Sequence, residues 1–138
     1  MAEGILKDLI KKENLNINKE NVKSAGLMTQ DGLFVSEKSV KALKKMNIDI
    51  SDYKSNYVKK ESFYEFDLIL TMTENHKNIL NKIAPNFSEK IFTLSEYIGD
   101  KDDVDDPFGM TQRIYDKTSL SLYEKISKLV DKLKKEGF

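Results

Sequence analysis

Apolar residues recur at helical spacing in several stretches of the chain and gather into short, mostly apolar runs in two others. The helical spacing predicts helices over residues 1–13, 36–47, 73–84 and 110–135, with a shorter one around 58–64. The apolar runs predict strands at 68–72 and 91–94, and the run at 68–72 is apolar enough to be buried on both faces. A third short strand, closed by Gly26, is expected at 22–26. Strands that alternate with helices form a parallel sheet through right-handed crossovers. We therefore expect an α/β fold, with a small parallel sheet flanked by helices on both faces.

Residues that commonly cap helices and form turns mark the ends of these elements. Ser36 and Thr73 are expected to cap the helices that follow them, and Gln30-Asp31-Gly32 is expected to form a turn. The first helix lacks such a residue. Ala2 and Glu3 suit the interior of a helix, and no Ser, Thr, Asp or Asn precedes them to cap the free N–H groups. This pattern predicts that the printed chain begins in the middle of an element.

Charge balance and cysteine content exclude several classes of function. The 138 residues hold 23 basic and 23 acidic side chains, so the balance favours neither nucleic acid nor a membrane as a partner. The chain has no cysteine, which excludes disulfides, thiolate metal sites and a cysteine nucleophile within these residues. No apolar run approaches the length of a membrane span, and the first residues are no signal peptide. We expect a single cytoplasmic domain without a metal or cofactor.

The stretch Asp105-Asp106-Pro107-Phe108-Gly109 ends a strongly acidic loop between the last predicted strand and the last helix. Proline fixes its own φ and favours an extended backbone at Asp106, which would hold the carboxylate out from the chain. A fixed carboxyl group beside the ring of Phe108 suits a general acid that faces a planar substrate. The same five residues also fit a plain turn. Because the loop follows a strand, we expect Asp106 at the carboxyl edge of the sheet, where such folds bind ligands.

Four segments of the sequence carry a resemblance to a known family. They are Met1-Ala2-Glu3, Val22-Lys23-Ser24-Ala25-Gly26, Phe66-Asp67-Leu68-Ile69-Leu70-Thr71-Met72-Thr73 and Asp106-Pro107-Phe108-Gly109. In order and spacing they resemble the low-molecular-weight protein-tyrosine phosphatases over essentially the whole chain. The Asp-Pro-Phe-Gly form is most similar to the bacterial branch that includes protein-arginine phosphatases. The resemblance implies an enzyme that removes phosphate from phosphotyrosine or phosphoarginine in proteins through a cysteinyl-phosphate, with phosphorylated proteins as substrates.

The resemblance also implies roles for four residues. Asp106 would be the general acid that protonates the leaving group and then deprotonates water, and its acidic neighbours would tend to keep it protonated. Phe108 would form a wall of the substrate slot or, alternatively, a half-buried anchor of the loop. Ser24 would hydrogen-bond to the phosphate-binding loop of the family, and Tyr53 stands about where many members carry a loop-supporting histidine.

One part of the family pattern is missing from this sequence. The pattern places a first strand, a C-x₅-R-S loop and a proline before the Met-Ala-Glu segment, whereas the chain begins at that methionine. In the resembled fold the missing strand is central, between residues 22–25 and 68–72. The leading hypothesis is a truncated phosphatase domain over residues 1–138, written from an internal methionine, inactive as written and able to self-associate through exposed strand edges. The alternative is a catalytically inactive module that binds phosphorylated proteins.

Overall fold

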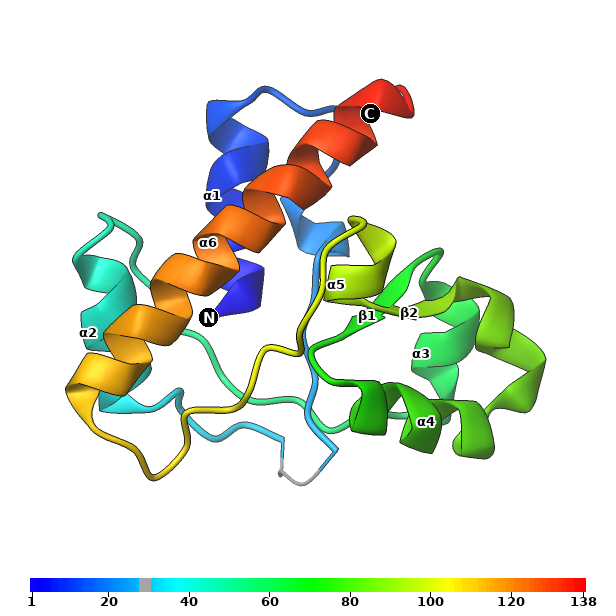
Figure 1. Ribbon diagram of the computed structural model, residues 1–138, viewed down its shortest axis with the longest axis horizontal. Coiled ribbons are helices and arrows are strands. Elements are labelled where there is room, and N and C mark those ends of the chain that lie inside the picture. Colours follow the sequence, from blue (N-terminus) through cyan, green and yellow to red (C-terminus); the bar gives the residue numbers. More distant parts are fainter. Residues whose placement is uncertain (28–30) are drawn as a thin grey trace.

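The computed structural model describes residues 1–27 and 31–138 and consists of helices around a short sheet (Figure 1). The α-helices are α1 (Ala2–Lys12), α2 (Glu37–Lys44), α3 (Lys60–Glu65), α4 (Glu74–Ile83), α5 (Leu94–Tyr97) and α6 (Gln112–Lys135). The strands are β1 (Ile69–Thr71) and β2 (Ile91–Thr93), and the 3₁₀ helices are η1 (Lys19–Asn21) and η2 (Pro85–Lys90). Gln30 of the predicted turn lies outside the described residues.

Strands β1 and β2 are parallel, with Ile69 opposite Ile91 and Thr71 opposite Thr93. Successive side chains of a strand point to opposite faces, and the two faces of this sheet are covered by different helices. Ile69 packs with the cluster formed by Phe63 of α3, Leu80 of α4 and Ile91. Leu70 packs instead against the larger core, on the side of α1 and α6 (Figure 1). The predicted α/β class, with a small parallel sheet and helices on both faces, is confirmed.

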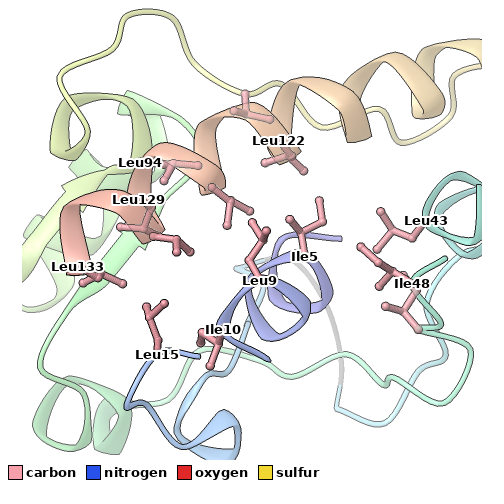
Figure 2. Packing of buried hydrophobic residues seen from close by; sticks show 14 residues of the cluster. Ile5, Leu9, Ile10, Leu15, Leu43, Ile48, Leu94, Leu122, Leu129 and Leu133 are labelled. Carbon is pink, nitrogen blue, oxygen red and sulfur yellow. The ribbon is translucent and has the colours of Figure 1, made fainter. Parts of the chain in front are cut away.

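The larger core lies between the first and last helices (Figure 2). Ile5 and Leu9 of α1, spaced four residues apart, face Leu122 and Leu129 of α6, and all four are at most 5% exposed. This spacing places apolar side chains on one stripe of each helix, as the sequence pattern predicts. This packing holds the two ends of the chain together, since α1 and α6 stand at opposite ends of the sequence.

The predicted strand at 22–26 is wrong. Among the described residues this segment forms only an isolated bridge, at Gly26, where the Gly26 N–H donates to the Asn56 carbonyl at 2.7 Å. The N–H of Ser24 donates instead to the Glu3 carboxylate at 2.8 Å. A strand requires a neighbour to complete its ladder, and no strand of the described chain lies beside residues 22–25. Their extended backbone therefore bonds to side chains.

Strand β1 is also less buried than its apolar sequence predicts. Ile69 and Leu70 are half-buried, and only Thr71 is buried. Both faces are covered, but the edge of β1 that points away from β2 pairs with no strand of the described residues. The partial exposure follows from this open edge.

Helix caps set several of the observed boundaries. Helix α6 begins at Gln112, two residues later than predicted, because Thr111 caps it through its hydroxyl. The short helix α5 was not predicted, although Thr93 and Glu96 form a reciprocal capping box at its start. Met1 makes no side-chain cap at the start of α1, as expected from the sequence.

Gly4 permits a close approach between α1 and the segment that follows α2. A Cβ atom at this position would lie 2.5 Å from Cγ2 of Ile50, a fully buried side chain. A real Cβ does not occur at that distance, so either the helix or the segment would have to move.

We predict that Gly4→Ala destabilises the fold, although alanine favours a helix by roughly 1 kcal/mol over glycine. Overpacking against Ile50 is expected to cost about 1–3 kcal/mol, which exceeds the propensity gain. The free energy of unfolding in urea measures the balance. Lys11→Ala, at an exposed position of the same helix, serves as the control and should change stability little. A Gly4→Ala chain as stable as the parent would contradict the close packing.

The open edge of β1 generates a second prediction. Unpaired N–H and C=O groups along a strand edge recruit strands from other chains. We expect the 138-residue chain to associate with itself, with a sedimentation coefficient that rises with protein concentration. A chain that sediments as a monomer at all concentrations and melts in one sharp transition would contradict this expectation.

Candidate functional site

Residues 100–110, called the acid loop below, cross the carboxyl end of β1. The backbone N–H of Val104 donates to the carbonyl of Met72, just beyond β1, at 2.9 Å. The carboxylate of Asp103 accepts the N–H of Glu74, in the first turn of α4, at 3.0 Å. Val104 is 7% exposed, so its side chain also anchors the loop in the core. The loop therefore lies at the edge of the sheet where the sequence predicts it.

The Asp106 carboxylate is fixed by its own turn. Its Oδ1 atom accepts the N–H of Phe108 at 3.0 Å. Pro107 is buried beneath this turn, and its carbonyl accepts the N–H of Met110 at 2.9 Å. Gly109 has a φ of 78°, a left-handed conformation that glycine adopts without strain. The Asp106 carboxylate thus folds back onto its own turn and does not extend away from the backbone in the way that proline alone implies. The residue is exposed, and its Oδ2 atom makes no hydrogen bond to the described residues.

The side chain of Phe108 is 83% exposed. The ring makes no aromatic or cation–π contact with the described residues, and only the backbone of Phe108 bonds to Asp106. The alternative interpretation, a half-buried anchor of the loop, is therefore wrong. An exposed ring beside an exposed carboxylate remains available to a ligand.

The start of α1 faces the acid loop. Burial lowers the pKa of the Met1 amino group, and the negative charges of Glu3 and Asp106 act in the opposite direction. Both carboxylates therefore lie within electrostatic reach of the first residue of α1.

The structure brings Ser24 and Tyr53 to the first turns of α1. Oε1 of Glu3 accepts the Ser24 N–H at 2.8 Å and the Ser24 hydroxyl at 2.9 Å. Oε2 of Glu3 accepts the ammonium of Lys7 at 2.9 Å, and that ammonium lies 5.3 Å from the centre of the Tyr53 ring. Tyr53 is half-buried, and burial is the main cause of its raised pKa. Ser24 and Tyr53 thus belong to one chain of contacts through Glu3 and Lys7, but no described hydrogen bond joins either of them to Asp106.

The acidic neighbours of Asp106 have other partners. The N–H of Lys101 and the ammonium groups of Lys128 and Lys125 lower the pKa of Asp100 to about 2. Both Nζ atoms lie 3.2 Å from Asp100 Oδ2. Asp103 caps α4, as described above. At least these two acids of the run are engaged in holding the loop.

Sequence reasoning missed Lys125, a buried residue of α6. A signal was present, because Lys125 follows Leu122 by three positions and so lies on the apolar stripe of the helix. A lysine in such a stripe requires acceptors for its charge, and an acidic loop precedes the helix in the sequence.

The described residues offer no group of three His, Asp or Glu side chains arranged to hold a metal ion. None of the helices in the described part of the chain has the length and apolar character needed to cross a bilayer. Arg113, the one arginine, is exposed on α6 and makes no hydrogen bond or ion pair with the described residues.

Comparisons with known proteins agree over nearly the whole chain. The family described as low molecular weight phosphotyrosine protein phosphatase matches residues 1–137. A protein-arginine-phosphatase of Bacillus subtilis (strain 168) is 35% identical over 137 residues, covering 99% of this chain and 89% of the relative. PtpB, a low molecular weight protein-tyrosine-phosphatase of Staphylococcus epidermidis, is 32% identical over 138 residues, covering 97% of this chain and 86% of the relative.

A solved structure extends the likeness to three dimensions. It is described as the YwlE arginine phosphatase, in a mutant with serine in place of cysteine and a phosphorylated active-site serine. It superposes on this chain with a TM-score of 0.92 at 34% identity, covering 99% of this chain and 88% of the other. The motifs, the fold and these matches lead to one conclusion: the chain belongs to the low molecular weight phosphotyrosine protein phosphatase family.

Proposed function

We propose that these residues form the acid-loop side of a protein phosphatase site, with Asp106 as the general acid and phosphotyrosine or phosphoarginine as the substrate group. The observation that carries the proposal is the placement of Asp106. Its exposed carboxylate is fixed by the Phe108 N–H and faces the start of α1 at the carboxyl end of β1. Relatives of both substrate classes support the two alternatives for the substrate.

The proposed reaction has two steps. In the first, a thiolate sulfur attacks phosphorus, and the bond from phosphorus to the tyrosine oxygen or arginine nitrogen breaks. Asp106 gives its proton to that departing atom. In the second, a water oxygen attacks phosphorus and the sulfur–phosphorus bond breaks. Asp106 takes a proton from the water, so that phosphate and thiolate are released and the acid is restored.

The nucleophile of this reaction is not among the printed residues, which include no cysteine. A covalent phosphoenzyme is supported by the solved relative, in which a phosphorylated serine occupies the active site of a mutant that carries serine for cysteine. The residues present here would supply proton transfer and one wall of the substrate site. Phe108, whose ring is free of contacts with the described chain, would lie against the planar part of the substrate.

A second candidate function is an inactive module that binds phosphorylated protein segments beside Phe108. The 83% exposure of the Phe108 side chain favours it, because the ring is open to a docking segment. The two candidates differ once a thiol is supplied, because only a phosphatase would then turn over.

For the 138-residue chain alone we predict no hydrolysis of aryl phosphates, since it has no thiolate to attack phosphorus. Release of phosphate from 4-nitrophenyl phosphate by purified protein measures this. Turnover that persists through purification and is lost in Asp106→Asn would contradict the prediction, because another nucleophile would then be at work.

A chain extended before Met1 by a strand and a C-x₅-R-S loop tests the role of Asp106. In this extended chain, Asp106→Ala should lower kcat for phenyl phosphate by about 10²–10⁴-fold, the usual contribution of a general acid. The loss should be much smaller for 2,4-dinitrophenyl phosphate, whose leaving group departs without a proton.

The neighbouring carboxylate provides the matched control. Asp105→Ala removes an exposed acid of the same loop and should leave both rates nearly unchanged. Equal losses on both substrates in Asp106→Ala would mean that Asp106 has a structural role. An extended chain that binds phosphorylated peptides without any turnover would favour the binding module.

A further inference from the structure

Lys125 is a buried cation that donates hydrogen bonds to Ser95 of α5 and to the first two residues of the acid loop. Its Nζ atom donates to Ser95 Oγ at 3.0 Å, to Asp100 Oδ2 at 3.2 Å and to the Lys101 carbonyl at 3.0 Å. An ammonium group has three N–H donors, so all three are satisfied. A buried charge without partners is costly, and removing the ones present here would leave the ammonium uncompensated.

Ser95 also holds the acid loop, at the residue that follows Lys101. Its side chain is buried, and its hydroxyl donates to the carbonyl of Asp102 at 2.5 Å. Asp102 has a φ of 69°, a left-handed conformation that a residue with a side chain adopts only when its surroundings hold it. Lys125 and Ser95 together fix the backbone of residues 100–102.

The path from this anchor to Asp106 is short and passes through Val104, whose side chain is buried in the core. Asp103 and Val104 make the two contacts to α4 and β1 described above, and Asp106 follows two residues later. At the far end of the loop the Met110 carbonyl accepts the ammonium of Lys38, an exposed residue. Exposed ion contacts hold a segment weakly, whereas buried ones hold it firmly. Among the contacts of the loop with lysine side chains, the buried one is that of Lys125, and the buried Val104 and Pro107 hold the loop beside it.

We propose that Lys125 is a positioning residue for Asp106, which acts by fixing the first residues of the acid loop to α6. Its effect on the order of the loop can be measured without any catalytic activity. Its effect on turnover rests on the proposed function of Asp106 as the general acid.

The first test uses the 138-residue chain and amide hydrogen exchange. In Lys125→Met the amides of Val104 and Phe108 should exchange roughly 10–100-fold faster, the consequence of losing hydrogen bonds to a charged group. Core amides such as that of Leu9 should keep their rates. The pKa of Asp100, measured by NMR, should rise from about 2 toward its ordinary 3.8, because one of its two lysine partners is gone.

Lys128→Met is the matched control. Lys128 also lies 3.2 Å from Asp100, but its side chain is 57% exposed, against 10% for Lys125, and it makes no contact with Ser95 or Lys101. It should raise the pKa of Asp100 without changing the exchange of Val104. Equal acceleration in both variants would overturn the proposal, as would unchanged loop exchange in Lys125→Met.

Chemical rescue separates the charge at position 125 from general damage to the core. Because the chain has no cysteine, Lys125→Cys can be aminoethylated in the unfolded state and refolded, which restores an ammonium at this position alone. Slow exchange at Val104 should return. Folded, modified protein that still exchanges fast would overturn the proposal. If Lys125→Met does not fold, Ser95→Ala replaces it, since it removes one acceptor and the bond to Asp102, and unchanged exchange there would also overturn the proposal.

Turnover is measured in the chain extended by the C-x₅-R-S loop. Lys125→Met should lower kcat for phenyl phosphate at least tenfold with little change in KM, and much less for 2,4-dinitrophenyl phosphate. Full turnover in a variant with a loosened loop would remove the positioning role. If Asp106→Ala itself has no effect on turnover, the general-acid function fails, while hydrogen exchange still decides whether Lys125 fixes the loop.

Discussion

The packing of α1 against α6 is the interaction on which both sides of the candidate site depend. Ile5 and Leu9 are buried against Leu122 and Leu129, and a fully buried side chain of this size contributes about 1.5–3 kcal/mol. The contact fixes where α1 begins. The same helix α6 carries Lys125 to the first residues of the acid loop. One helix therefore sets the distance between the start of α1 and Asp106.

The small sheet places a second constraint on the fold. With two strands among the described residues, the sheet leaves backbone groups of neighbouring segments without a ladder partner, and these groups bond elsewhere. The Glu3 carboxylate accepts the N–H of Ser24, and the Met72 carbonyl accepts the N–H of Val104. These substitute bonds are also the ones that bring the segments of the candidate site to one edge of the sheet. The candidate site is thus formed by loop segments whose backbone groups do not pair within the sheet.

The sequence predicts the parts of this structure that depend on local pattern and misses those that depend on distant neighbours. Helical periodicity places α1, α4 and α6, and apolar runs place β1 and β2. The extended segment at 22–26 fails as a strand because pairing is decided by a neighbour that local pattern does not include. At the site, the sequence predicts the position of Asp106 at the sheet edge. The bond from the Phe108 N–H and the burial of Lys125 arise from the folded loop and helix, so neither was predicted.

The acidic residues before Pro107 differ in the partners of their carboxylates. Asp100 is held as an anion by Lys125 and Lys128, whereas Asp106 has no lysine partner among the described residues. These two lysines contact the first acid of the run, and no described lysine pairs with the carboxylate near its far end. Helix α6 thus holds the start of the acid loop through its cations, while Asp106 is held by the backbone of its own turn.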